Sequence, residues 1–359
     1  MYGAEYQVIS QVEFLDKEKF NCYLILFEAD NETHSEFLAF SLKKSFKVIS
    51  IHSGRKFDVK AIFKLRTILR EKDVEIAHAH GYKSIIFVFL ATRFTKIKLV
   101  TTLHGWVEYS LKLKLYNLLA KICLFFFDRI ITVSGKLLEE TKHYVGAQKV
   151  VEIRNAIDFK RFIGLEPINL YVEFNIDTSN KIVLYAGRLS KEKGLYYLIQ
   201  TMYLLQRQRK DVIILILGDG EIEKDLKNFV SKLCLEEKII FSGWREDILG
   251  VIKSCSIFIL PSLTEGLPLA LMEAMFLGKP IISTDVGGIR ELVEDNTDGI
   301  LVKPKDIFSI RDAICRILDD KELSEKLANN AAKKIRERFD FKGVIKEYEN
   351  IYVTLLLRK

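Results

Sequence analysis

The chain has 359 residues, of which 49% are hydrophobic and 29% charged, and its formal net charge is +7. A chain of this length and composition folds as a globular protein with room for two domains, which excludes disordered and fibrous classes, and its modest charge predicts no nucleic-acid partner. Five cysteines without Cys-x-x-Cys spacing exclude a disulfide framework and a zinc site, and without a signal peptide or an apolar run of roughly twenty residues we expect a cytoplasmic protein.

Short apolar runs predict two series of strands separated by helical patterns. In the first half the predicted strands are Cys22–Phe27, Phe46–Ile51, Val74–His78, Lys98–Leu103, Arg129–Val133 and Lys149–Ile153. In the second half they are Lys181–Ala186, Val212–Leu217, Lys238–Phe241, Ser256–Leu260, Pro280–Ser283 and Gly299–Val302. Strands that alternate with helices form parallel sheets covered on both faces, so the predicted fold class is α/β with doubly wound sheets.

Histidines stand at two strand ends of the first half. His104 follows the run Lys98–Leu103 and precedes Gly105, at the carboxyl end of a predicted strand. His78 and His80 are two residues apart and so share one face of an extended strand, a spacing that metal ligands also use. Because no cysteine or carboxylate stands nearby in the sequence, we expect no metal there.

The stretch 111–127 is amphipathic when it is drawn as a helix. Leucine, isoleucine and phenylalanine side chains gather on one face, with Lys112, Lys114 and Lys121 along its margins. Such a helix can lie on anionic lipid at the inner face of the membrane. The alternative, which we favour from the sequence, is that its apolar face packs on the first sheet.

The weakest patterning falls between Asn155 and Asn180, where we place the domain boundary. The predicted domains are residues 1–163 and 164–338, followed by a helix within 339–359.

The predicted strand Lys181–Ala186 runs into Gly-Arg-Leu-Ser-Lys-Glu-Lys-Gly, residues 187–194. Gly187 lets the backbone approach a ligand closely, and Arg188 and Lys193 place two cations just beyond the strand end. A planar guanidinium and a compact ammonium group suit a diphosphate. A solvated loop is the alternative.

Two further segments follow later strands. Gly218-Asp219-Gly220-Glu221 comes after Val212–Leu217, and Arg245 comes after Gly243-Trp244. Asp219 and Glu221 are better explained by a tight turn that caps the next helix than by a metal pair.

The stretch 261–275, Pro-Ser-Leu-Thr-Glu-Gly-Leu-Pro-Leu-Ala-Leu-Met-Glu-Ala-Met, carries the strongest signal in the chain. Glu265 lies in a strand-to-helix loop, Pro268 suits the first helical turn, and Glu273 lies early in the helix. The unpaired N–H groups of that turn form an anion site. Carboxylates beside it would repel a phosphate unless they face neutral hydroxyls on either side of it, as in a nucleotide sugar.

The Gly187-Arg188-Leu189 and Lys193-Gly194 elements, together with the Glu-x7-Glu pair, resemble the donor site of the retaining GT-B glycosyltransferases. The resemblance is to "glycosyl transferases group 1", glycosyltransferase family 4, and it covers nearly the whole chain. It implies two facing Rossmann-like domains with a cleft between them, and a last helix, Phe341–Leu357, that crosses back to the first domain. It also implies a nucleotide-sugar donor (UDP-, GDP- or ADP-linked), no cofactor, and a glycan or lipid-linked acceptor.

The resemblance also assigns roles to individual residues. Arg188 and Lys193 would hold the donor diphosphate, Glu273 the ribose, and Glu265 the transferred sugar. His104 would lie beside the reacting sugar. The other expected site residues are Gly3, Gly187, Gly218, Gly220, Arg245, Gly266, Leu267 and Pro268 on the donor side, and His80 and Asn155 on the acceptor side.

The start of the chain departs from the family pattern. Members usually open with a strand and a glycine-rich turn, whereas Met1-Tyr2-Gly3-Ala4-Glu5 already resembles the end of that turn. We therefore expect the first strand of the N-terminal sheet to be missing, which would uncover a strand edge.

The predicted activity is metal-independent transfer of a sugar to a hydroxyl with retention of configuration, in cell-surface polysaccharide assembly. Two alternatives stay open: an epimerase or phosphorylase of the same architecture, and a non-catalytic or impaired sugar-nucleotide-binding protein.

Overall fold

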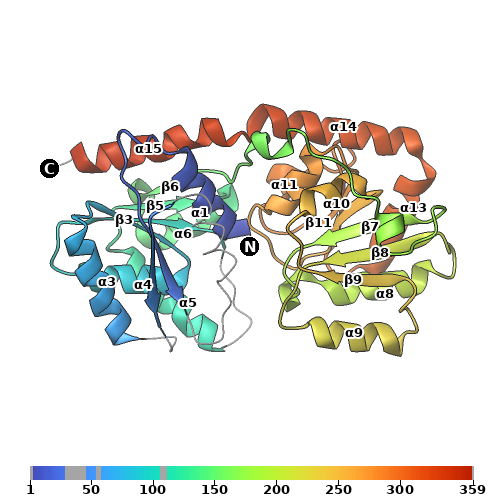
Figure 1. The fold of residues 1–359 in the computed structure, drawn as a ribbon, viewed down its shortest axis with the longest axis horizontal. Coiled ribbons are helices and arrows are strands. Elements are labelled where there is room, and N and C mark those ends of the chain that lie inside the picture. Colours follow the sequence, from blue (N-terminus) through green and yellow to red (C-terminus); the bar gives the residue numbers. More distant parts are fainter. Residues whose placement is uncertain (1–2, 29–45, 54–57, 106–110, 358–359) are drawn as a thin grey trace. The chain divides into compact units, whose positions relative to one another are not determined.

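The structure is a computed structural model that describes residues 3–28, 46–53, 58–105 and 111–357. Its contacts divide the chain into two compact units, Met1–Asn155 with Phe341–Lys359, and Ala156–Asp340. Both units consist of parallel strands and helices (Figure 1), so the predicted α/β class is confirmed. In the described part of the chain, no helix is long and apolar enough to cross a bilayer.

The first unit holds strands in two separate ladders. Its helices are α1 (Gly3–Phe14), α3 (Val59–Glu71), α4 (Tyr82–Thr92), α5 (Leu111–Leu124), α6 (Gly135–Val145) and α15 (Phe341–Leu357), with a 3-10 turn at Ala147–Lys149. Its strands are β1 (Leu24–Glu28), β2 (Val48–His52), β3 (Ile76–His80), β4 (Lys98–Leu103), β5 (Arg129–Thr132) and β6 (Val150–Glu152). Among the described residues β1 pairs with β2 alone, while β3, β4, β5 and β6 form a four-stranded sheet.

The sheet of the first unit is therefore interrupted between β1 and β3. No strand of the described residues pairs with the edge of β1 opposite β2 or with the edge of β3 opposite β4. The described part of the chain begins with a helix, α1, and not with a strand. The expectation of a missing first strand stays a prediction.

The second unit holds one six-stranded parallel sheet in the order β12-β11-β10-β7-β8-β9. Its strands are β7 (Lys181–Ala186), β8 (Val212–Leu217), β9 (Ile239–Gly243), β10 (Ile257–Leu260), β11 (Ile281–Thr284) and β12 (Ile300–Val302). Its helices are α7 (Leu170–Glu173), α8 (Leu195–Leu205), α9 (Glu223–Lys232), α10 (Ile248–Ser254), α11 (Leu269–Phe276), α12 (Ile289–Leu292), α13 (Ile307–Asp319) and α14 (Lys321–Arg338), with 3-10 turns at Phe159–Phe162 and Lys191–Lys193.

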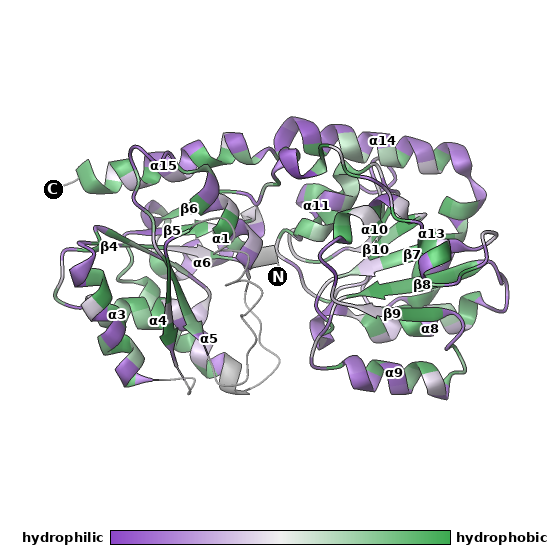
Figure 2. Cartoon of the chain, viewed as in Figure 1, coloured by the Kyte–Doolittle hydropathy of each residue, from purple (hydrophilic) through white to green (hydrophobic). Residues whose placement is uncertain are grey.

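Burial explains why hydrophobic and polar residues do not alternate along the central strands. Every residue of β8, Val-Ile-Ile-Leu-Ile-Leu, is buried, because helices cover both faces of the sheet. Figure 2 shows β8 in the colour of hydrophobic residues, while α14 is mostly hydrophilic. The predicted ranges Lys98–Leu103, Lys181–Ala186 and Val212–Leu217 match β4, β7 and β8 at both ends.

The division between the units differs from the predicted boundaries at 163 and 338. The backbone N–H of Ile157 donates to the carbonyl of Phe339 (3.0 Å), and Ile157 forms a bridge with Asp340. Phe159 and Phe162 pack on Phe276 of α11, at ring-centroid distances of 4.7 and 4.2 Å. Residues 156–163 therefore belong to the second unit, whereas Asn155 stays in the first.

Candidate active site

The two motif loops of the second unit leave adjacent strands. β7 and β10 are neighbours in the sheet, and chain order reverses between them: β8 and β9 lie beyond β7, and β11 and β12 beyond β10. Open parallel sheets bind ligands at the carboxyl ends of their strands, at such a reversal. Residues 187–194 follow β7 and residues 261–268 follow β10, so the fold places both predicted motifs at this position.

An ion pair joins the two motif loops. Lys193 Nζ lies 2.7 Å from Glu265 Oε1, with side-chain exposures of 21% and 7%. The Ser262 hydroxyl donates to the same carboxylate oxygen (2.6 Å), and the backbone N–H of Leu263 donates to the carbonyl of Glu192 (2.7 Å). The predicted sugar-facing acid and one of the predicted diphosphate cations are thus held together in one cluster.

Glycines let the loops around this cluster approach closely. A Cβ on Gly194, which has a φ of +67°, would lie 2.0 Å from the Pro261 carbonyl oxygen. A Cβ on Gly218 would lie 2.0 Å from the Gly187 carbonyl oxygen. Gly220 is equally restricted, because its Cβ would lie 2.2 Å from the Leu189 carbonyl oxygen. The structure therefore gives Gly194, Gly218 and Gly220 a packing role between loops.

Arg188 is exposed on the loop that follows β7. Its backbone is fixed, because the hydroxyl of the buried Tyr185 donates to the Arg188 carbonyl (2.8 Å). The next residue is fixed as well, since the N–H of Leu189 donates to the Asp219 carbonyl (2.7 Å). Arg188 is thus an exposed residue on a hydrogen-bonded main chain, five positions before Lys193 in the sequence.

The helix α11 begins at the second motif. Pro268 occupies its N-cap position, and Leu267 just before it is buried, with Gly266 between that leucine and Glu265. The N–H groups in the first turn of a helix have no acceptor within the helix, and the helix dipole makes this end positive. The structure thus places a helix N-terminus at the second motif, and anion binding there stays a prediction.

Glu273, on α11, has a partner that sequence reasoning missed. Its Oε1 accepts a hydrogen bond from Nη1 of Arg161, in a pair whose side chains are 8% and 27% exposed, respectively. Packing of Phe159 and Phe162 against Phe276 holds the 3-10 turn that carries this arginine. No local sequence pattern predicts this contact, because the two residues are 112 positions apart.

Arg245, predicted to lie near the donor base, is bound by two carboxylates. It pairs with Glu173 on α7 and with Asp247 (2.6 Å), and its side chain is 16% exposed. Hydrogen bonds to these carboxylates raise the pKa of the guanidinium further above its usual range. Arg245 therefore stabilises the junction between α7 and the loop before α10, and its contact with a base stays a prediction.

The first unit brings the three predicted strand-end histidines together. His80 Nδ1 and His104 Nε2 lie 3.3 Å apart, and the rings of His78 and His80 stack at 4.4 Å. His78 also shares hydrogen bonds with Thr102 (2.9 Å) and with the hydroxyl of Tyr352 on α15 (2.6 Å). Strand β3 extends to His80, so both of its histidines lie within the strand.

Burial lowers the pKa of every histidine in this cluster. The pKa of His104 falls to about 4 and that of His78 to about 3, and the pKa of His80 falls well below its usual range. Desolvation is the main cause, and repulsion between the rings adds to it for His78 and His80. All three rings are therefore neutral near pH 7, where each offers one donor and one acceptor.

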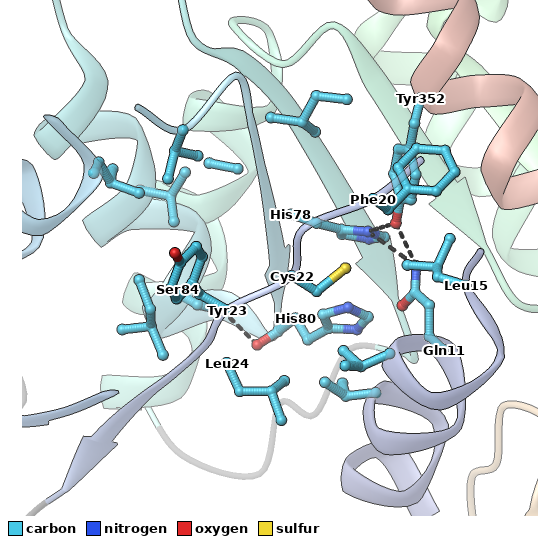
Figure 3. Close-up of a pocket in the computed structure, with 18 of the residues that line it drawn as sticks. Gln11, Leu15, Phe20, Cys22, Tyr23, Leu24, His78, His80, Ser84 and Tyr352 are labelled. Carbon is cyan, nitrogen blue, oxygen red and sulfur yellow. Dashed lines mark hydrogen bonds between the residues drawn. The ribbon is translucent and has the colours of Figure 1, made fainter. Parts of the chain in front are cut away.

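A cavity of about 1170 Å³ lies beside these histidines in the first unit. Residues of β1 line one side and residues of β3 another, with α1 and α15 contributing further walls. Figure 3 shows Gln11, His78 and Tyr352 pointing toward one another at its border, with Cys22, Tyr23 and Leu24 along the neighbouring chain. The cavity thus coincides with the interruption of the sheet.

The remaining predicted site residues are placed as follows. Gly3 is the first residue of α1, and Asn155 is buried at the end of the first unit. Within the described ranges, no group of three or more His, Cys, Asp or Glu side chains is arranged to hold a metal ion.

Comparisons with known proteins bear on both units. The family model of glycosyl transferases group 1 matches residues 170–334, and that of glycosyltransferase family 4 matches residues 1–161. An uncharacterized glycosyltransferase of Methanocaldococcus jannaschii is 31% identical over 75% of this chain and 71% of that protein. The chain is a group 1 glycosyltransferase. Glycosyl transfer from a nucleotide sugar follows from this membership as its general activity.

Other relatives of this glycosyltransferase match over nearly the whole length. An Escherichia coli protein named UDP-Gal:alpha-D-GlcNAc-diphosphoundecaprenol alpha-1,3-galactosyltransferase is 28% identical over 99% of the chain and 95% of its own. The crystal structure of Anabaena HepE in complex with UDP-glucose superposes with a TM-score of 0.85 at 21% identity, covering 99% of this chain and 96% of that one. The predicted GT-B fold is confirmed by this likeness.

Proposed function

We propose that this glycosyltransferase moves a hexose or related sugar from a nucleoside-diphosphate sugar to a hydroxyl group of a glycan or lipid-linked acceptor. The observation that carries the proposal is the Lys193–Glu265 pair at the reversal point of the sheet, with an exposed Arg188 and the N-terminus of α11 in the adjoining loops. Cations and helix N–H groups attract a diphosphate, while the acids beside them suit sugar hydroxyls.

The two acids have one oxygen each available for a ligand. In Glu265 the contacts made by described residues fall on Oε1, and the same holds for Glu273. A second carboxylate oxygen is therefore left to accept hydroxyl groups in each case. We assign Glu273 to the ribose and Glu265 to the transferred sugar.

The donor and acceptor classes are supported by the names of relatives. The Escherichia coli relative is named for a UDP-linked donor and a lipid diphosphate acceptor, and a 23% identical Staphylococcus aureus relative is named for capsular polysaccharide biosynthesis. A uridine diphosphate sugar is thus the first donor to test, before GDP- and ADP-sugars. A lipid-linked saccharide is the first acceptor, in a pathway of surface polysaccharide assembly.

In the proposed mechanism, the oxygen of an acceptor hydroxyl forms a bond to the anomeric carbon while the bond from that carbon to the diphosphate breaks. The proton of the hydroxyl passes to the departing diphosphate oxygen. The electron pair leaves with the diphosphate, whose growing negative charge is stabilised by Arg188, Lys193 and the first turn of α11. Retention of configuration and independence of metal ions belong to this proposal. A neutral His104, with His80 beside it, would orient sugar or acceptor hydroxyls by hydrogen bonds.

Product analysis tests the proposal. The purified chain is incubated with each nucleotide sugar, with and without a lipid-diphosphate saccharide, and products are separated by mass and by the NMR signal of the anomeric proton. A new glycoside of unchanged anomeric configuration supports the proposal. Conversion of the donor without an acceptor would point to an epimerase or phosphorylase, and nucleotide binding without turnover would point to a non-catalytic protein.

A further inference from the structure

The helix α5 exposes a broad apolar surface on the first unit. We call it the α5 patch and define it by six residues that are 42–59% exposed, four on α5 and two directly after it: Leu115, Leu118, Leu119, Ile122, Phe125 and Phe126. These residues belong to the apolar face of the stretch 111–127, which we expected from the sequence to pack on the first sheet. That favoured interpretation is wrong, because the face is solvent-exposed.

The helix packs through its other side. Asn117, Ala120, Cys123, Leu124 and Phe127 are buried, the last two completely. Consecutive turns of α5 thus carry apolar side chains in two directions, one set in the core and one in solvent. Packing in the core of the unit explains why the buried residues are apolar, but it does not explain the exposed ones. An exposed apolar surface of this extent marks an interaction site.

Basic side chains surround the α5 patch. The Arg93 guanidinium lies over the rings of Phe126 (5.3 Å) and Phe94 (5.2 Å), and Phe94 is itself 92% exposed. Lys149 Nζ donates to the carbonyl of Phe125 (2.7 Å), and Lys114 is exposed on the helix. The sequence has no Asp or Glu between residues 81 and 98 or between residues 111 and 127.

We propose that the α5 patch docks on the surface of an anionic lipid bilayer. Apolar side chains with a basic border match the acyl boundary and the negative headgroups of such a surface. A second copy of the chain fits less well, because a symmetric contact would bring two borders of like charge together. The patch would lie in the plane of the interface, so no bilayer-spanning segment is needed.

Vesicle sedimentation tests this proposal. The full chain is mixed with vesicles of phosphatidylcholine alone or of phosphatidylcholine and phosphatidylglycerol in equal parts. We expect it to bind the anionic vesicles at least about tenfold more tightly, and to bind less tightly as salt is raised. Substituting Lys114→Gln should weaken binding about fivefold, which is the effect of one basic residue near an anionic surface.

A triple variant, Leu118→Ser, Ile122→Ser and Phe125→Ser, should weaken vesicle binding by at least about tenfold. The matched control is the triple variant Ile163→Ser, Val172→Ser and Phe308→Ser, which removes side chains of the second unit that are 80%, 77% and 56% exposed. Phe308 also lies under an arginine, Arg311, at 5.5 Å, as Phe126 lies under Arg93. The control variant should bind like the wild type.

Three results would overturn the proposal: wild-type protein that stays in the supernatant with anionic vesicles, an equal loss of binding in both triple variants, or a concentration-dependent dimer that the α5 variant abolishes. Circular dichroism and the urea midpoint check that the α5 variant is folded. If it is not, the Lys114→Gln and salt series decide the outcome. We expect the α5 variant to keep the thermal shift with the nucleotide donor, because the proposed donor residues lie in the second unit, so failure here is separable from failure of the proposed activity.

Discussion

Lys193 Nζ and Glu265 Oε1 lie 2.7 Å apart, in loops that follow two neighbouring strands of the second sheet. The side chain of Lys193 is mostly buried and that of Glu265 almost completely buried, with exposures of 21% and 7%. An ion pair in this setting fixes the relative position of both loops, because either charge alone would be costly to bury. The ion pair therefore acts together with the hydrogen bond from Leu263 to Glu192 to set the geometry of the two loops.

Removing either predicted diphosphate cation should reduce turnover. We expect Arg188→Ala and Lys193→Ala each to lower kcat/KM by roughly 10²–10³-fold, because each loses charge stabilisation of the departing diphosphate. Lys191→Ala is the matched control: this lysine is exposed in the same 3-10 turn and should keep near wild-type activity. Steady-state kinetics with the identified donor measure the effect, and near-normal kcat/KM in Arg188→Ala would remove that residue from the site.

Loss of the partner of Glu273 should destabilise the second unit. In Arg161→Met the carboxylate of Glu273 stays almost fully buried without its cation, and we expect the free energy of unfolding to fall by about 1–3 kcal/mol. Urea denaturation measures this. The control is Arg290→Met, whose pair with Asp285 is at the surface and should leave the unfolding midpoint unchanged. Equal midpoints in the two variants would show that the Arg161–Glu273 contact contributes nothing.

The sequence predicted the sheets better than it predicted the site. β4, β7 and β8 were predictable to the residue because continuous apolar runs are typical of strands buried on both faces. Arg161 was not, since its segment has weak patterning and its contact with Glu273 depends on how distant residues pack. For the same reason the Lys193–Glu265 pair was not foreseen, although both residues were predicted to lie in the site.

The buried face of α5 was predicted wrongly for a different reason. Apolar residues on two faces satisfy an amphipathic pattern in more than one orientation, and sequence alone does not say which face meets the sheet. In the structure Leu124 and Phe127 are buried, while Ile122 and Phe125 are exposed. The division of the first unit into a β1-β2 ladder and a β3-β4-β5-β6 sheet could not be read from the apolar runs alone, because they predict strands and not their pairing.

Acidification should destabilise the first unit through its histidines. Burial depresses the pKa of His104 to about 4, whereas an unfolded histidine titrates near 6.5. The unfolded state therefore binds more protons between these values, so stability is fully present above pH ~6.5 and is lost as pH falls toward 4. Urea midpoints at several pH values should fall steadily across this window. His104→Asn should make the dependence less steep, with His78 and His80 keeping the remainder, and an NMR titration of the wild-type His104 ring near pH 6.5 would contradict the prediction.

Chelation should leave activity unchanged. The proposed stabilisation of the diphosphate uses Arg188, Lys193 and the first turn of α11, so no divalent ion is required for bond breakage. We expect turnover after dialysis against EDTA to equal that of untreated enzyme, and added Mg²⁺ or Mn²⁺ to raise it less than about twofold. The enzyme assayed without dialysis is the control. Loss of activity on chelation, restored by a metal ion, would overturn the metal-independent mechanism.

Two glycines with the same φ angle should respond differently to substitution. Gly194 and Gly278 both have a φ of +67°, which costs an alanine about 1–2 kcal/mol. A Cβ at Gly278 has no neighbour within 4 Å, whereas one at Gly194 would lie 2.0 Å from the carbonyl oxygen of Pro261. In Gly278→Ala the free energy of unfolding should therefore fall only by this conformational cost. In Gly194→Ala it should fall distinctly more, because the added Cβ forces the loops after β7 and β10 apart. The same displacement should weaken donor binding. Urea denaturation and donor thermal shift measure both effects, and equal losses in the two variants would show that the loops tolerate the added atom.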